Sequence, residues 1–156
     1  MLFRSVVRVN GVIVSSGTPS AAIALSVGSN VITTLVTAQD GVSTRTYTIT
    51  VTRAPSNNAD LSNLVPSTGG LTPAFASATT NYTISVPNTT TSITVTPTLA
   101  SAFATVKVNT VTVASGSPSS AIALSVGANV ITTVVTAQDG TTTKTYTITV
   151  TRAPAA

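Results

Sequence analysis

One long sequence occurs twice in this chain, and the two copies lie 99 residues apart. The stretch from Asn129 to Pro154 reads NVITTVVTAQDGTTTKTYTITVTRAP, and the stretch from Asn30 to Pro55 is nearly identical to it. The register between the copies holds without insertion or deletion from Val7 onward. A fixed period indicates repeated structural units, so we expect the two copies to fold in the same way.

Each copy predicts a β-hairpin. Two runs rich in β-branched residues flank an Asp-Gly pair, which is Asp40-Gly41 in the first copy and Asp139-Gly140 in the second. The run after the pair alternates Thr with Tyr, Ile and Val, which is the period-two pattern of a half-buried strand. Glycine supplies a positive φ at such a turn, and aspartate accepts hydrogen bonds from its own backbone. We therefore interpret these four residues as hairpin turn residues.

Residues 56–156 predict a complete β-sandwich. Short strand-like segments follow one another at regular intervals, separated by Gly, Pro, Asn and Ser, which is typical of an all-β sandwich. The period is also close to the size of an immunoglobulin-like domain, about 100 residues. The expected strands are residues 61–65, 81–86, 92–98, 105–108, 111–114 and 121–124, followed by the hairpin.

The alternation within these segments predicts the core. Tyr146, and Tyr47 at the matching place in the first copy, are expected to be core rings with bonded hydroxyls. Arg53 and Arg152 close the last strand of each copy and are expected to be solvated strand ends or contacts between units. The other expected core residues are Leu61, Leu64, Tyr82, Ile84, Val86, Ile93, Val95, Val106, Val108, Ile122, Leu124, Ile131, Val135, Ile148 and Val150.

Residues 1–55 predict only the later half of a second sandwich. If one unit begins near Asn58, the chain holds about one and a half units of 99 residues. A half sandwich would expose an apolar sheet face and open strand edges, which need a partner. We expect strands from upstream chain or from a neighbouring copy to complete it. Head-to-tail completion between copies would not close, and it would therefore build a filament.

The residue inventory argues against an enzyme. The chain has no His, Cys, Trp or Glu, and its acids are Asp40, Asp60 and Asp139. This leaves no thiolate or imidazole metal site, no disulfide, no catalytic residue and no expected cofactor. Seven basic residues are spread along the chain with few aromatics, so we expect no nucleic-acid partner. No apolar run is long enough for a membrane-spanning helix.

Several surface features allow more than one interpretation. Asn81 and Asn88 match the N-glycosylation pattern, and Asn88 is the better candidate because it lies in an expected loop. O-linked sugars on the Thr-rich strands are an open alternative. Alternating Thr residues could also suggest ice or carbohydrate binding, but sandwich sheets twist, and Thr is a favoured residue on exposed strands.

Several motifs agree in order and spacing with a known family. They are Asn58 to Leu64 (NADLSNL), Leu71 to Phe75 (LTPAF), Thr80 to Thr83 (TNYT), and the segment from Val135 to Arg152. Together they resemble the cadherin-like β-sandwich repeat that occurs in tandem in large bacterial surface and secreted proteins. The resemblance implies an extracellular or cell-surface module with no catalytic residues. True cadherins bind calcium through grouped acidic ligands, which three isolated Asp residues do not supply.

The leading hypothesis is therefore a non-catalytic structural repeat of an extracellular bacterial stalk or filament. Its expected partner is itself, either as a homopolymer or as neighbouring repeats of the same chain, with glycans as a further candidate. The alternative is an adhesin or carbohydrate-binding module that grips a ligand at loops 66–73 or 115–120.

Overall fold

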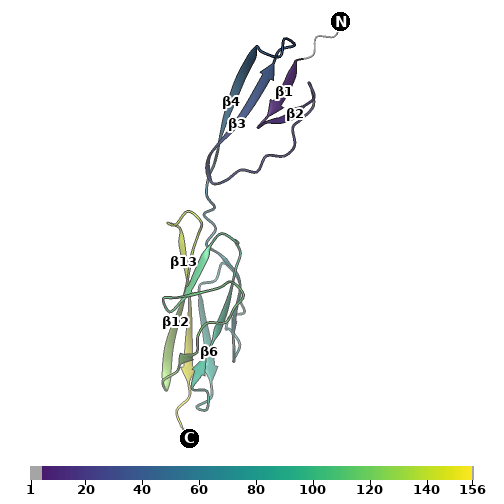
Figure 1. The fold of residues 1–156 in the computed structure, drawn as a ribbon. Helices are drawn as coiled ribbons and strands as arrows, with labels where there is room; N and C mark the ends of the chain where they lie inside the picture. The colour runs from purple at the N-terminus through teal and green to yellow at the C-terminus, as the bar shows by residue number, and fades with distance from the viewer. Residues whose placement is uncertain (1–4, 156) are drawn as a thin grey trace. The chain divides into compact units, whose positions relative to one another are not determined.

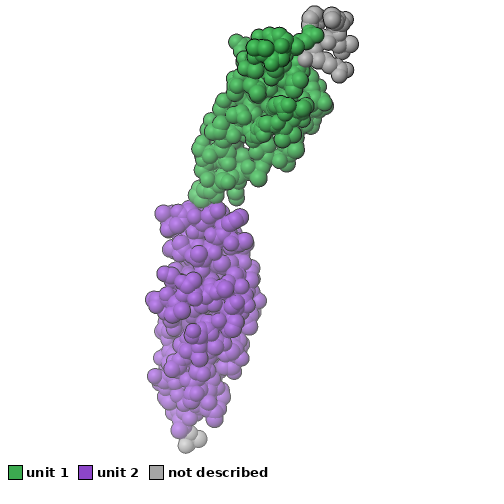
Figure 2. Space-filling model, viewed as in Figure 1, with its two compact units in different colours: residues 1–55 green, residues 56–156 purple. Residues whose placement is uncertain are grey.

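The computed structural model describes residues 5–155, and every regular element within them is a β-strand (Figure 1). The chain divides into two compact units, Met1–Pro55 and Ser56–Ala156, which Figure 2 colours separately. The described residues contain no helix long and apolar enough to cross a membrane. The boundary between the units falls between Pro55 and Ser56.

Unit 1 is a single antiparallel sheet. Its strand order is β2-β1-β3-β4, so β2 and β4 are the edge strands. The long β3–β4 hairpin pairs without a bulge, from Gly28 opposite Arg53 to Thr37 opposite Thr44. The strands are β1 (Val6–Val9), β2 (Val12–Val14), β3 (Gly28–Thr37) and β4 (Thr44–Arg53).

The hairpin turn follows from local chemistry. The Ala38 amide donates to the Ser43 carbonyl at 2.8 Å, which closes the loop. Gly41 has a φ of 70°, a conformation that favours glycine. The Asp40 Oδ1 atom accepts from the amide of Val42 at 2.9 Å. The turn at Asp139-Gly140 repeats these features.

Unit 2 contains strands that have no counterpart among the described residues of unit 1. A five-stranded sheet has the order β10-β9-β12-β13-β6, and two small sheets pair β5 with β8 and β7 with β11. Strand β6 joins β13 in parallel, whereas the other pairs are antiparallel. The strands are β5 (Leu61–Pro66), β6 (Asn81–Val86), β7 (Ser92–Ile93), β8 (Val95–Leu99), β9 (Thr105–Val108), β10 (Val111–Val113), β11 (Ile122–Ala123), β12 (Gly127–Thr136) and β13 (Thr143–Arg152).

The expected strand over residues 92–98 is divided in the structure. Its first part, β7, pairs with β11, and its second part, β8, pairs with β5. At the break, the Thr94 amide donates to Ser67 Oγ and the Val95 amide donates to Ser119 Oγ. Side-chain hydroxyls thus replace ladder partners where the chain changes sheets.

The core of unit 2 lies on the inner face of the large sheet. All the expected core residues of this unit are buried except Ile122, which is half-buried against them. Ile122 lies on the short two-residue strand β11, which leaves part of its side chain uncovered. The sequence alternation did not indicate five further buried apolar residues, which are Ala59, Pro97, Ala104, Val113 and Ala137. The alternation of β13, with Tyr146, Ile148 and Val150 facing inward, is that of a half-buried strand.

Candidate functional site

The candidate site is the face of the unit 1 sheet that matches the core face of unit 2. We call it the open face, and it consists of Val7, Val9, Ile32, Val36, Tyr47, Ile49 and Val51. Tyr47 and Ile49 are 52% and 56% exposed, whereas their counterparts Tyr146 and Ile148 are 0% exposed. Sequence reasoning placed Tyr47 in a core, and this was wrong. The residues that cover Tyr146 have no counterpart among the described residues of unit 1.

In unit 2 the inner face is covered by residues 56–99, which we call the first-half block. This block supplies β5, β6, β7 and β8. Its side chains Leu61, Leu64, Ile93 and Val95 are at most 2% exposed. Its strand β6 pairs with β13 from Asn81 opposite Thr147 to Val86 opposite Arg152. In unit 1 the corresponding strand β4 lies at the sheet edge instead.

The hydroxyl of Tyr146 fixes the block onto the large sheet. It accepts a hydrogen bond from the Leu61 amide at 3.0 Å and donates one to the Ser77 carbonyl at 2.9 Å. The ring of Phe75, from the same block, lies 6.3 Å from the Tyr146 ring. A tyrosine at this position therefore contacts the apolar surface of the block with its ring and the backbone of the block with its hydroxyl.

Lys144 makes a second polar contact with the block. Its Nζ lies 2.7 Å from Asp60 Oδ1 and 2.7 Å from the Ser77 carbonyl, and it sits 5.4 Å from the centre of the Tyr146 ring. The hydrogen bond to Asp60 raises the pKa of Lys144 above its ordinary value. Unit 1 carries Arg45 at the matching position.

Arg152 makes a third contact, and it corrects the expectation of a solvated strand end. This side chain is half-buried, and its Nε donates to the Asn88 carbonyl at 2.9 Å while its Nη1 donates to the Leu124 carbonyl at 2.7 Å. Carbonyls near the strand end thus hold its guanidinium inside its own unit. Arg53 repeats the second contact, because its Nη1 donates to the Leu25 carbonyl at 2.8 Å.

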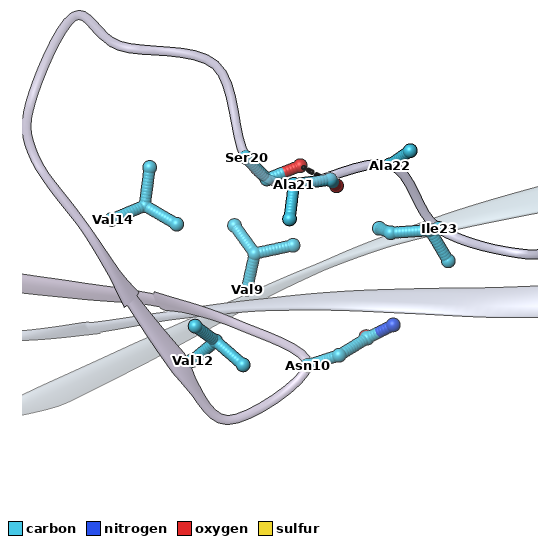
Figure 3. Close-up of a pocket in the computed structure, with 8 residues that line it drawn as sticks. All are labelled: Val9, Asn10, Val12, Val14, Ser20, Ala21, Ala22 and Ile23. Atoms are coloured by element: carbon cyan, nitrogen blue, oxygen red, sulfur yellow. Dashed lines mark hydrogen bonds between the residues drawn. The ribbon is translucent and has the colours of Figure 1, made fainter.

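A cavity of about 130 Å³ lies beside β1 and β2 in unit 1 (Figure 3). Val9 and Val14 point toward the segment that carries Ser20 and Ile23. Ser20 Oγ donates to the neighbouring Ala21 carbonyl at 3.0 Å. The cavity is therefore a mostly apolar hollow next to the open face.

The equivalent segment of unit 2 is bound to the first-half block. Ser119, the counterpart of Ser20, donates its amide to the Val95 carbonyl at 2.9 Å. Its Oγ accepts from the Val95 amide at 3.0 Å. The Gly116 amide donates to the Pro97 carbonyl at 2.8 Å. Sequence reasoning treated residues 115–120 as a loop tip and missed this role, although the repeated serine was a visible signal.

One protein family matches this chain over two stretches. The model of the cadherin-like beta sandwich domain matches residues 4–54 and residues 60–153. The chain belongs to the cadherin-like β-sandwich family. The first matched stretch, in unit 1, is about half as long as the second.

Two other comparisons add little to the family. No curated protein sequence matches this cadherin-like chain. A solved structure of Clostridium thermocellum CbhA fibronectin(III)-like modules is similar over 96% of this chain and 78% of that chain. The identity is 14% and the TM-score is 0.27.

Asp40 and Asp139 occupy matching hairpin turns of the two cadherin-like units. The pKa of each carboxyl is held below its ordinary value, first by a side-chain hydrogen bond from Ser43 or Thr142 and then by backbone amides. Each carboxylate is thus satisfied by its own turn. Among residues 5–155, no three acidic, His or Cys side chains come close enough together to hold a metal ion.

The two candidate glycosylation sites differ in their surroundings. The amide nitrogen of Asn88 donates to the Ala153 carbonyl at 3.0 Å, and the residue is half-buried. Asn81 is exposed at the start of β6, and its amide nitrogen lies 3.3 Å from Thr80 Oγ1. Glycosylation of either residue remains a prediction. Asn88 would have to give up a hydrogen bond within its cadherin-like unit.

Proposed function

We propose that this chain is a non-catalytic structural repeat module of an extracellular stalk or filament on a bacterial surface. The observation that carries the proposal is the open face of unit 1. The counterparts of its side chains are all buried in unit 2. The open face is therefore a surface of the kind that packs against a partner. The chain belongs to the cadherin-like family. The repeats that it resembles occur in tandem in bacterial surface proteins, which supports the extracellular assignment.

Unit 1 exposes apolar side chains such as Tyr47 and Ile49 on its open face. A contiguous apolar sheet face marks an interaction surface in a soluble protein, and a sheet must bury its apolar face against another element to be stable. Edge strand β4 adds unpaired backbone groups along the same surface. Both features favour assembly with further units, either by strand complementation between copies or by stacking of tandem repeats.

A catalytic role has no support in the described residues. Asp40 and Asp139 are occupied by their turns, and Asp60 is paired with Lys144. An acid–base pair needs two titratable groups directed at a common substrate position. None of these three carboxylates lies in such an arrangement.

No specific observation on the described residues favours the alternative of a ligand-binding loop. In the loop over residues 115–120, Ser115 Oγ accepts from the Leu99 amide and Ser119 Oγ accepts from the Val95 amide. These hydroxyls therefore serve the fold of unit 2. A carbohydrate site would need aromatic side chains or free polar groups at the same place.

Immunogold electron microscopy of intact producing cells tests the proposal. Antibodies raised against the purified chain should decorate extended structures outside the cell, with several gold particles along each one. Antibody adsorbed beforehand with the purified chain is the control and should leave the structures unlabelled. Label confined to the cell interior, or to dispersed single molecules in the medium, would overturn the proposal.

A further inference from the structure

We propose that the open face of unit 1 binds a further first-half block. This block would belong to the same polypeptide and would precede β1 in the sequence. This inference rests on the proposed function and names the partner of the open face. The occupant is defined by its chemistry, which is that of residues 56–99. Unit 2 displays the complete contact, and unit 1 displays the receiving half of it.

Each receiving group of unit 2 has a counterpart in unit 1. Tyr47 stands for Tyr146, and its half-exposed ring leaves the hydroxyl available to a backbone amide like that of Leu61. Arg45 stands for Lys144 and would pair with a carboxylate at the Asp60 position. A guanidinium offers two parallel donors to a carboxylate, so this substitution keeps the charge pair and adds geometric selectivity.

The backbone adds a second set of complementary groups. In unit 2, the Thr147 amide donates to the Thr80 carbonyl at 2.7 Å, and the Ala153 amide donates to the Val86 carbonyl at 3.0 Å. Both bonds fasten β6 to the outer side of β13. Strand β4 of unit 1 is the counterpart of β13 at the repeat spacing, and it lies at the edge of its sheet. A β6-like strand could pair with this edge in parallel.

The cavity beside β1 extends the same receiving surface. In unit 2, the segment after β10 binds β8 through Ser119, whose Oγ accepts from the Val95 amide. Ser20 lines the unit 1 cavity together with Val9 and Val14. A β8-like strand at this place would fill the hollow and bond to Ser20 in the same way.

The balance of blocks argues against a second copy of this chain as the donor. Residues 5–155 contain two receiving sheets but a single first-half block. If a copy lent its block to a neighbour, it would expose Ile131, Tyr146 and Ile148, which are 0% exposed in unit 2. Such an exchange would cover the open face of one copy but expose the equivalent face in unit 2 of the donor copy. A further block is needed, and covalent attachment would give it a high effective concentration.

The connection in unit 2 supports attachment on the β1 side. The block runs directly from β8 into β9 through residues 100–104. Strand β1 is the counterpart of β9 at the repeat spacing, because Val7 matches Val106. A block joined ahead of β1 therefore has the chain path that unit 2 already uses.

The first experiment fuses a copy of residues 56–99 directly ahead of Met1 in the full chain. Hydrogen exchange read by mass spectrometry should then show the amides of β4 protected at least about tenfold more than in the unfused chain. The control fusion carries Leu64→Asp in the added copy and should leave β4 unprotected. Unit 2 of the same molecule reports whether the protein is folded. A protected unit 2 with an unchanged β4 in the first fusion would overturn the inference.

The second experiment uses a cysteine pair, which is unambiguous because the chain has no cysteine. In unit 2, Thr147 lies opposite Asn81. The corresponding pair in the fusion is Thr48 of unit 1 and the residue equivalent to Asn81 in the added copy. Thr48→Cys with Asn81→Cys in the added copy should give a disulfide within one molecule. A disulfide between molecules would instead assign the face to a second copy, and no disulfide would deny the β4–β6 pairing.

The two proposals fail separately. Protection of β4 by the added block without labelled structures on cells would leave the inference standing and refute the proposed function. Labelled structures on cells with an unprotected β4 in the fusion would do the reverse.

Discussion

Tyr47 and Tyr146 lie in hairpins of nearly the same sequence, yet one ring is half exposed and the other is fully buried. The two hairpins share their register, with Gly28 opposite Arg53 in unit 1 and Gly127 opposite Arg152 in unit 2. The conformation of the hairpin is therefore a local property. In unit 2 the burial of its side chains depends on residues 56–99, which cover the inner face of that unit.

Other local features also recur in both units. Asn10 and Asn109 have positive φ angles of 47° and 44°, and the side-chain oxygen of each accepts from a β3 or β12 amide at 2.9 Å. These contacts are made whether or not the inner face is covered. Substitutions at matching positions can therefore separate what the hairpin does alone from what the first-half block adds.

The largest difference is expected at the buried isoleucine. Ile148→Ala should lower the free energy of unfolding of unit 2 by about 2–5 kcal/mol, because it removes buried methyl groups and leaves a cavity. Ile49→Ala, on the 56% exposed counterpart, should change stability by less than about 0.5 kcal/mol. Denaturant unfolding, followed by hydrogen exchange of each unit, checks the pair. Equal losses in the two units would mean that the open face is covered within this chain.

A smaller difference is expected at the tyrosine hydroxyl. Tyr146→Phe should destabilise unit 2 by about 1–3 kcal/mol, because the buried Leu61 amide loses its acceptor. Tyr47→Phe should be close to neutral. Exchange of the Leu61 amide is the direct readout in unit 2. Retained protection of that amide in the Tyr146→Phe variant would contradict this role.

A stabilising change is expected at Thr133. This residue is fully buried, and its Oγ1 has no hydrogen-bond partner among residues 5–155. Thr133→Val removes an unsatisfied hydroxyl and should raise the stability of unit 2 by about 1 kcal/mol. Thr34→Val at the half-buried counterpart is the matched control and should have a smaller effect. Thermal unfolding of each variant gives the comparison.

The ion pair between Lys144 and Asp60 should contribute less than about 1 kcal/mol, since both side chains are partly exposed and screened by solvent. The raised pKa of Lys144 sets the sign of its pH dependence. The contribution is fully present below the ordinary value of 10.5 and is lost as pH rises through the raised value. Unfolding of unit 2 at several pH values from about 9 to about 12, which span the ordinary lysine range, checks this. Asp60→Asn should abolish the difference.

The turn aspartates should respond to acid, and equally in both units. Their lowered pKa values mean that the stabilisation is present above the ordinary value of 3.8 and is lost as pH falls through the lowered value. Exchange of the Ser43 and Thr142 amides, which donate to the carboxylates, should accelerate together on acidification relative to their intrinsic rates. A response in unit 2 alone would show that this turn depends on the first-half block.

Much of the fold could be predicted because its signals are local or periodic. The hairpins follow from Asp-Gly turns between alternating runs, and the boundary near Pro55 follows from the end of a repeat. The inner face of unit 2 follows from the period-two pattern, which indicated 15 of the buried residues, such as Leu61 and Tyr146. These inferences need no knowledge of distant partners.

The polar contacts of the site could not be predicted in this way. Lys144 meets Asp60 across 84 residues, and the Tyr146 hydroxyl bonds to the Leu61 amide across 85. The amide of Val95 reaches Ser119 where the chain changes sheets. Alternation indicates the side of a sheet on which a residue lies, but it carries no information about which backbone atoms come opposite.

By itself, the amino-acid sequence determined the hairpins, their turns and the apolar face of each copy, because these depend on neighbours in the chain. Only the tertiary structure decided how far each side chain is covered, with Tyr47 52% exposed and Tyr146 0% exposed, and which polar groups of unit 2 meet, such as the Tyr146 hydroxyl and the Leu61 amide. Burial is a property of what packs against a side chain, and in unit 2 residues 56–99 pack over Tyr146 and Ile148.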